Sequence, residues 1–208
     1  MDNRKYVIGI DFGTDSVRAL VVATDNGEEI ASCVSLYKRW SEGKYCNPKQ
    51  NQYRQHPLDY IESLTEAVNG ALAQCDEAVS GGVVGLSFDC TASTPVLTDC
   101  EGTPLALLQE YAENPDAMFI LWKDHTAIAE SDKINEVAKR WHTDYTKYGG
   151  GNHSCEWVWA KMLHSLRVAP ELQRDAYSWM EHCDWISALL SGDTTPEKII
   201  RSRCAAGH

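Results

Sequence analysis

The sequence predicts an α/β protein with a mixed sheet that opens in antiparallel hairpins. Three apolar strands come first, at residues 6–12, 17–23 and 29–37. An amphipathic helix follows over residues 57–78, and a buried strand at 83–88 comes after it. A fully parallel dinucleotide-binding fold would need strand–helix–strand units from the start, and this order does not provide them.

Turn signals separate the first three strands. Gly13-Thr14-Asp15-Ser16 forms a tight polar turn between the first and second strands. Asp25-Asn26-Gly27-Glu28 marks the second hairpin, because Asn-Gly readily takes the positive φ values that such a turn needs. We therefore expect these strands to pair antiparallel, with a loop of phosphate size between the first two.

The middle of the chain carries loop and helix signals in succession. Residues 41–56 are polar and show no clear period, so they are predicted to form an exposed loop that includes His56. Pro57 suits the first position of a helix, and Gly81-Gly82 ends the helical region. Between them, apolar side chains recur at three- and four-residue steps, at Leu58, Ile61, Leu64, Val68, Leu72 and Cys75.

The second half of the chain is predicted to be mostly helical. It begins with a candidate hairpin in which residues 94–97 and 105–107 flank a turn. Apolar stripes then predict helices around 134–141, 159–166 and 185–190. His153 is expected in an exposed loop. The tryptophans near these stripes are interpreted as packing residues: Trp141, Trp157, Trp159, Trp179 and Trp185.

Composition and charge restrict the class of partner and the compartment. The net charge is −11, and such an acidic surface repels phosphate backbones, so nucleic acid is not an expected partner. The eight cysteines show no Cys-x-x-Cys spacing, which favours reduced thiols in a cytoplasmic protein over disulfides or zinc. No long apolar run predicts a membrane span, and the short first strand ends in a carboxylate, unlike a signal peptide.

The strongest chemical motif spans Ile8 to Arg18. A strand delivers Asp11 to its end, and Gly13 lets the backbone approach a ligand without a Cβ in the way. Asp11 is the candidate ligand of a hydrated Mg²⁺ ion that neutralises the phosphates of ATP. A bare Asp-x-Gly-Thr pattern also fits an ordinary hairpin with a polar turn. The predicted phosphate- and magnesium-binding residues are Asp11, Gly13, Thr14, Asp15, Ser16 and Arg18.

In its context this motif resembles the first phosphate loop of the actin–hexokinase–Hsp70 superfamily. Further segments resemble the FGGY carbohydrate kinases of that superfamily, and within them the kinases of L-ribulose. They follow one another in order along nearly the whole chain, at residues 37–40, 51–61, 88–94, 121–127, 178–185 and 201–208. The resemblance implies a ribonuclease-H-like, actin-like ATPase domain with helices on the faces of its sheet.

The resemblance also implies a reaction and a sugar pocket. The reaction is ATP-dependent phosphorylation of L-ribulose to L-ribulose 5-phosphate, a step of L-arabinose catabolism. Carried over by position, Ala92 and Trp122 would line the sugar pocket, and an indole suits both the C–H face and the hydroxyls of a sugar. Polar contacts to the sugar are expected from Lys123, Asp124 and His125. Asp89, at a strand end, is expected to contact either the sugar or a metal-bound water.

The family pattern extends beyond this chain. The aspartate that acts as general base, the second phosphate loop and the adenosine-binding segment would all come after residue 208, and a sugar-binding lysine would directly follow His208. Residues 1–208 are therefore expected to form an incomplete N-terminal kinase domain without turnover of its own. Apolar surface that would normally contact the rest of the kinase is then expected to be exposed. Such surface favours self-association, as in a homodimer.

Three other functions remain open from the sequence. Another FGGY kinase, acting on xylulose, ribitol or glycerol, shares the same motifs. A ribonuclease-H-like nuclease could gather Asp11, Asp89 and Asp184 around two metal ions, although the chain predicts no basic groove. An actin-like ATP-binding module without kinase activity shares the first loop. His182 and Cys183 could suggest a catalytic pair, but they are interpreted as packing residues near a helix start.

Overall fold

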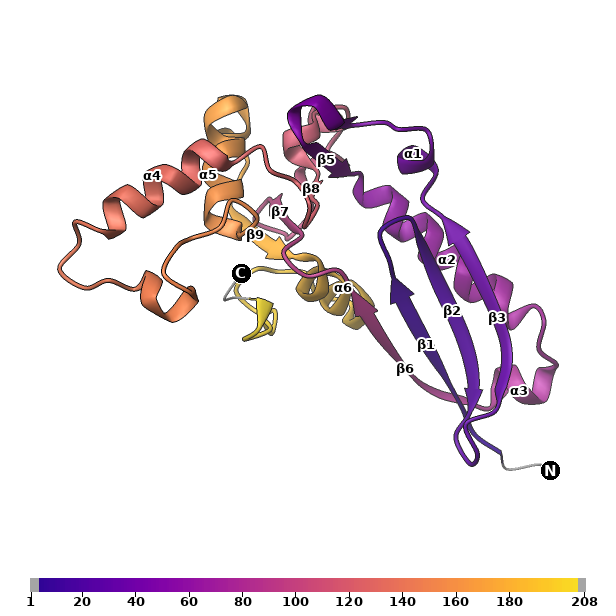
Figure 1. Ribbon diagram of the computed structural model, residues 1–208. Coiled ribbons are helices and arrows are strands. Elements are labelled where there is room, and N and C mark those ends of the chain that lie inside the picture. Colours follow the sequence, from indigo (N-terminus) through magenta and orange to yellow (C-terminus); the bar gives the residue numbers. More distant parts are fainter. Residues whose placement is uncertain (1–3, 206–208) are drawn as a thin grey trace. The chain divides into compact units, whose positions relative to one another are not determined.

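The computed structural model describes residues 4–205 (Figure 1). The chain divides into two compact units. Unit 1 contains the chain up to Lys44 together with Leu58–Thr91, and unit 2 contains Tyr45–Pro57 together with the chain from Ala92 onward. Each unit has its own strands and helices.

Two predictions that involve the ends of the chain are not tested by the described residues. Gly207 and His208, which close the last family-like segment, lie outside the described residues. The assignment of residues 1–208 to one incomplete kinase domain stays a prediction. Within the described residues, no helix is both long enough and apolar enough to cross a membrane.

Unit 1 is built on a four-stranded mixed sheet in the order β3-β2-β1-β6. Strand β1 pairs antiparallel with β2 and parallel with β6, and β2 pairs antiparallel with β3. This confirms the predicted mixed sheet that opens in antiparallel hairpins. The strands are β1 (Tyr6–Phe12), β2 (Ser16–Ala23), β3 (Glu29–Leu36) and β6 (Val83–Cys90).

Helix α2 (Pro57–Leu72) covers one face of this sheet. Alternate residues of β1 and β2 point toward that face and are buried, because successive side chains of a strand point to opposite sides. Phe12 packs edge-on against Tyr60 of α2, with ring centroids 6.3 Å apart. The opposite face is exposed at Gly9, Asp11 and Arg18, so polar groups there are free to meet a ligand.

The predicted helix over residues 57–78 is in fact two helices. Helix α2 ends at Leu72, and a short helix α3 (Glu77–Gly81) follows after a turn. The side chain of Asp76 accepts a hydrogen bond from the N–H of Val79 at 2.8 Å and so caps the start of α3. The apolar spacing continued through the turn, but it did not reveal the cap that begins a new helix.

Unit 2 combines short strands with three longer helices. Strand β5 (Gln52–Gln55) pairs with β4 (Cys46–Asn47) and with β8 (Phe119–Ile120), while β7 (Pro95–Thr98) pairs antiparallel with β9 (Ser178–Glu181). The longer helices are α4 (Ile128–Ala138), α5 (Val158–Val168) and α6 (His182–Ser191). Besides α3, the short helices of the described residues are α1 (Lys38–Ser41), η1 (Pro48–Gln50), η2 (Leu105–Leu107), η3 (Gln109–Tyr111), η4 (Pro115–Ala117), η5 (Thr146–Gly149) and η6 (Pro170–Arg174).

Two sequence predictions for unit 2 are wrong. Residues 41–56 are not simply an exposed loop: β5 lies within them, and Arg54, Gln55 and His56 are buried. The hairpin between 94–97 and 105–107 does not form, because residues 105–107 fold into the short helix η2, while β7 pairs with β9. Only Pro104 bridges back to β7, and proline has no N–H with which to extend such a ladder.

Gly102 marks a place where the backbone of unit 2 is tightly packed. Its φ is +78°, and an added Cβ would lie 1.8 Å from the carbonyl oxygen of Thr194. We expect Gly102→Ala to lower the free energy of unfolding by about 2 kcal/mol, since it adds both backbone strain and a clash. Chemical denaturation measures this. Gly192→Ala is the matched control, because Gly192 has a φ of +84° but no atom near its would-be Cβ; equal losses would show that the Thr194 contact has no effect.

Candidate functional site

The two candidate carboxylates of unit 1 lie side by side on its exposed sheet face. Asp11 is paired with Arg18 of β2 on one side and with Asp89 of β6 on the other. Residues paired in this way share one face of a sheet. The sequence left Asp89 as a contact of either the sugar or a metal-bound water, and the structure brings it beside Asp11, at the same ends of two parallel strands. Two neighbouring carboxylates suit Mg²⁺, which prefers oxygen ligands.

The loop after β1 is closed by its own backbone. The N–H of Gly13 donates to the carbonyl oxygen of Ser16 at 3.0 Å. A Cβ at Gly13 would meet only that same oxygen, at 3.5 Å, which is an ordinary contact. The protein itself therefore has room for a side chain at Gly13, and the glycine leaves the backbone open to a ligand.

Tyr37 and Trp40 hold this loop from the chain that follows β3. The buried Tyr37 hydroxyl donates to the carbonyl oxygen of Gly13 at 3.2 Å, and the Tyr37 N–H donates to the carbonyl oxygen of Asp15 at 3.0 Å. The indole N–H of Trp40 donates to the Asp15 carboxylate at 2.6 Å. Burial, together with the nearby carboxylate of Asp11, raises the pKa of Tyr37, so its hydroxyl keeps its proton.

Asp59 extends this support to helix α2. Its carboxylate accepts hydrogen bonds from the N–H groups of Arg39 and Trp40, at 3.1 and 3.2 Å, and caps the first turn of α1. Arg39 also pairs with Asp59 and with Glu62. Sequence reasoning included Tyr37, Trp40 and Asp59 in family-like segments but gave them no role. Their place in those segments was the only sequence feature that could have indicated a role at the loop.

The sugar-binding candidates of unit 2 lie on two segments, around Ala92 and around Trp122. Trp122 follows β8, and its side chain is 44% exposed, so it is not core packing. Lys123 places its Nζ 4.8 Å from the centre of the Tyr53 ring. His125 pairs with Glu156 at 2.7 Å. Trp122 therefore has an accessible indole, as a sugar-stacking residue needs.

Lys161 joins these two segments. Its buried ammonium donates to the carbonyl oxygens of Ser93 at 2.5 Å and of Leu121 at 3.0 Å, which are the immediate neighbours of Ala92 and Trp122. Ser93 also has a φ of 52°, an unusual value for a serine. The sequence did not identify Lys161. The feature that could have identified Lys161 is its position on the buried face of a helix. In α5 it lies on the same buried face as Val158, Met162 and Ser165.

Asp124 is fully buried, and its contacts are structural. One carboxylate oxygen accepts from the N–H of Tyr53 at 2.7 Å and from the Arg54 guanidinium. The other accepts from the N–H and hydroxyl of Thr126, at 3.0 and 2.6 Å. The network fixes the turn that carries Trp122 and Lys123 against β5. A direct contact between Asp124 and the sugar stays a prediction.

The burial of Lys161 makes the stability of the protein dependent on pH. Desolvation lowers the pKa of Lys161 from 10.5 to about 8. Burying the charged form of Lys161 lowers the free energy of unfolding, and this destabilisation is present in full below pH 8. It disappears as the pH rises toward 10.5, so the free energy of unfolding increases across that pH range. We expect Lys161→Met to lower the free energy of unfolding by about 2 kcal/mol at pH 7, because carbonyls lose their donor.

The difference in free energy of unfolding between the parent and Lys161→Met should be larger at pH 10 than at pH 7. Urea unfolding of both proteins at the two pH values measures the difference, in which other titrations largely cancel. Lys133→Met, at an exposed site of α4, should show neither effect. A gap that stays constant with pH would contradict the lowered pKa.

Other residues considered for catalysis have packing roles in unit 2. His182 is fully buried at the start of α6, with its ring 5.4 Å from that of Phe119, as its packing interpretation predicted. Asp184 is buried and accepts from the N–H of Ser202 at 2.8 Å. Between residues 4 and 205, no group of three or more His, Cys, Asp or Glu side chains is arranged to hold a metal ion. His153, predicted as exposed, is instead half-buried.

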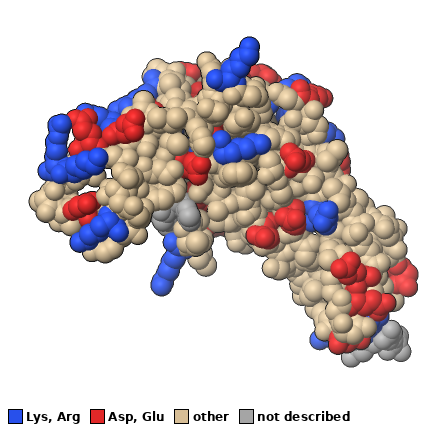
Figure 2. All heavy atoms as spheres, viewed as in Figure 1, with Lys and Arg blue, Asp and Glu red and all other residues tan. Residues whose placement is uncertain are grey.

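The charge on the face in Figure 2 is mixed rather than basic. Blue and red side chains are interspersed over that face, and acidic ones gather over the end of unit 1 that holds α3. No continuous basic stripe is visible there. This distribution gives no support to a nucleic-acid surface on that face.

Known proteins resemble the chain in sequence and in structure. No protein-family model matches it. A ribulokinase of Vibrio parahaemolyticus serotype O3:K6 is 48% identical over 207 residues, which are 99% of this chain and 36% of the relative. A ribulokinase of Mycolicibacterium smegmatis is 38% identical over 98% of this chain and 36% of its own length. The chain thus spans about a third of each of these relatives.

Solved structures show the same fold at low sequence identity. Xylulose kinase from Bifidobacterium adolescentis matches with a TM-score of 0.69 and 17% identity, over 98% of this chain and 39% of that one. Glycerol kinase from Plasmodium falciparum with ADP matches with a TM-score of 0.60 and 13% identity, over 91% and 35%. The predicted actin-like ATPase fold is confirmed. Along almost its whole length the chain is therefore a homologue of the ribulokinases and shares the fold of the sugar kinases.

Proposed function

We propose that this chain supplies the phosphate-binding loop and part of the sugar pocket of an ATP-dependent kinase that converts L-ribulose to L-ribulose 5-phosphate. The observation that carries the proposal is the loop after β1, which hydrogen bonds from Tyr37 and Trp40 fix in place beside Asp11. The identity of 48% to a ribulokinase supports L-ribulose as the substrate, and thereby a role in arabinose use.

The residues of unit 1 fit magnesium and a triphosphate. Asp11 and Asp89 are adjacent on the exposed sheet face, and the backbone at Gly13 is accessible. Mg²⁺ bound there would neutralise charge on the transferred phosphate. Arg18, next to Asp11, would add a positive charge for phosphate oxygens. Thr14 and Ser16 would add hydroxyl or N–H donors.

In unit 2, Trp122 would stack on the C–H face of the sugar while Lys123 contacts its hydroxyls. Lys161 and Asp124 would act as positioning residues, since they fix the chain next to Trp122 and Ala92. No residue of this chain is proposed as the general base. We therefore expect the chain alone to lack kinase turnover.

A chimera tests this function. The chain replaces the matching segment of the 48% identical ribulokinase, and phosphorylation of L-ribulose is measured with ATP and Mg²⁺. We expect the chimera to be active on L-ribulose and the isolated chain to be inactive. D-xylulose, ribitol, D-ribulose and glycerol are assayed in parallel. A folded chimera without activity on any of them would overturn the kinase proposal, and a preference for another substrate would overturn L-ribulose.

A further inference from the structure

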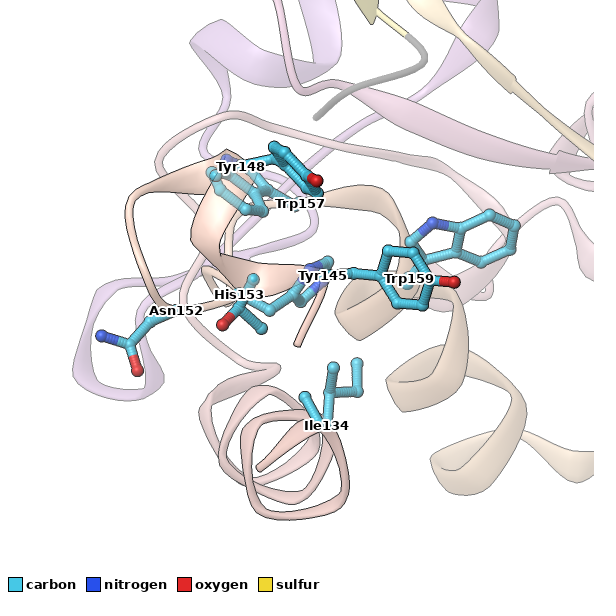
Figure 3. A pocket seen from close by; sticks show the side chains of 10 residues that line it. Ile134, Tyr145, Tyr148, Asn152, His153, Trp157 and Trp159 are labelled. Carbon is cyan, nitrogen blue, oxygen red and sulfur yellow. The ribbon is translucent and has the colours of Figure 1, made fainter. Parts of the chain in front are cut away.

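Unit 2 contains an aromatic cavity that the proposed kinase site does not use. Its volume is about 430 Å³, within the usual range for small-molecule sites. Figure 3 shows Ile134 pointing from α4 toward Tyr145, with Tyr148 and Trp157 beyond it. The cavity is lined by Ile134, Ala138, Tyr145, Thr146, Tyr148, Gly149, Asn152, His153, Trp157 and Trp159.

The aromatic side chains around this cavity are unusually exposed. Tyr145, Tyr148 and Trp159 are 63%, 79% and 58% exposed. Single exposed aromatic residues are common, but a group of them around one hollow marks a binding surface. Flat rings of this kind pack well against the apolar C–H face of a sugar ring, and the tyrosine hydroxyls and the indole N–H remain able to form hydrogen bonds.

His153 supplies a polar atom that lacks a partner. Its Nε2 is buried and has no hydrogen bond within the described structure. Its backbone is fixed to α4, since its N–H donates to Asn135 at 2.7 Å and its carbonyl oxygen accepts from Ser131 at 2.7 Å. Its ring lies edge-on to Trp157, with centroids 5.2 Å apart. A buried polar atom without a partner is costly, and a ligand hydroxyl would satisfy it.

The uncharged lining of the cavity favours an uncharged ligand. No Lys, Arg, Asp or Glu is among its lining residues, so an ionic ligand would enter without a counter-charge. Burial lowers the pKa of His153, which keeps the imidazole neutral at pH 7. An adjoining hollow lined by Val137, Trp141 and Leu163 is more apolar and has no such unsatisfied ring nitrogen. The two hollows therefore differ in the chemistry that they offer.

We propose that the cavity between α4 and the start of α5 binds the ring of a neutral saccharide, stacked on Tyr148 or Trp159 and hydrogen-bonded to His153. None of its lining residues belongs to the candidate kinase site, so this second site is independent of the proposed reaction. A neutral sugar offers both features that the cavity needs, a flat apolar face and hydroxyl groups.

Isothermal titration of the intact chain with methyl β-D-glucoside and with maltose tests the proposal. We expect saturable binding with a Kd of about 1 mM, as for a small ligand with few contacts. Sorbitol, which lacks a ring face, and the anion glucuronate should bind far more weakly. No saturable binding of either neutral sugar would overturn the proposal, and so would equal binding of glucuronate.

Single substitutions locate the site. Tyr148→Ala and His153→Phe should each weaken binding about fivefold, because one removes a stacking face and the other a hydrogen bond. Trp141→Ala is the matched control: Trp141 is 56% exposed but lines the adjoining hollow and not this cavity. Trp122→Ala should also leave this binding unchanged. If Trp122→Ala abolishes it while Tyr148→Ala does not, the sugar occupies the proposed kinase site and the second site does not exist.

Discussion

Asp124→Asn is expected to lower the free energy of unfolding by about 3–5 kcal/mol, the usual cost of removing one partner from a buried ion pair. Asp124 is fully buried and Arg54 is 1% exposed. An amide in place of the carboxylate leaves the Arg54 charge with Asp116 alone, which pairs with it at 3.0 Å. The new amide N–H groups would also face the N–H donors of Tyr53 or Thr126.

Urea unfolding followed by circular dichroism measures this loss. Asp132→Asn on α4 is the matched control, because Asp132 is exposed, and it should change stability by less than about 0.5 kcal/mol. Arg54→Met and the double variant complete a cycle. The two losses should not add, because each single change breaks the same network. Small and additive losses would mean that the network does not hold the turn at Trp122.

Asp11→Asn in the chimera is expected to reduce kcat on L-ribulose about 10³-fold, with little change in stability. An asparagine has the shape of aspartate but no charge, so it holds Mg²⁺ and the developing phosphate charge poorly. Asp11 is exposed on the sheet face, so folding does not depend on burying it. Rates measured across a Mg²⁺ titration should show a higher magnesium requirement as well as the lower rate.

Glu29→Gln provides the matched control for this variant. Glu29 is an exposed carboxylate on β3 of the same sheet, away from the loop after β1, and its loss should leave the rate within about twofold. If Asp11→Asn retained the parent rate and magnesium dependence, the assignment of Asp11 to the metal would be wrong. The kinase activity itself would then still stand, and the metal would need other ligands.

The opening hairpin of unit 1 was largely predictable, because its signals are local. The strand 6–12, the polar turn and the strand 17–23 follow one another directly, so Asp11 and the loop after it could be located from spacing alone. The neighbours of that loop were less predictable. Asp89 is separated from Asp11 by α2 and α3 in the chain, and only the parallel pairing of β1 with β6 brings them together.

The sequence by itself determined the three opening strands, their antiparallel pairing and the polar turn between the first two, since alternation, turn residues and apolar spacing act over a few neighbouring positions. Only the tertiary structure decided the roles of Arg54, Asp124 and Lys161. A buried charge is stable only with its partners, and those partners are distant in sequence: Arg54 meets Asp124 from 70 residues away, and Lys161 reaches a carbonyl 68 residues before it. No local pattern in the chain encodes such contacts.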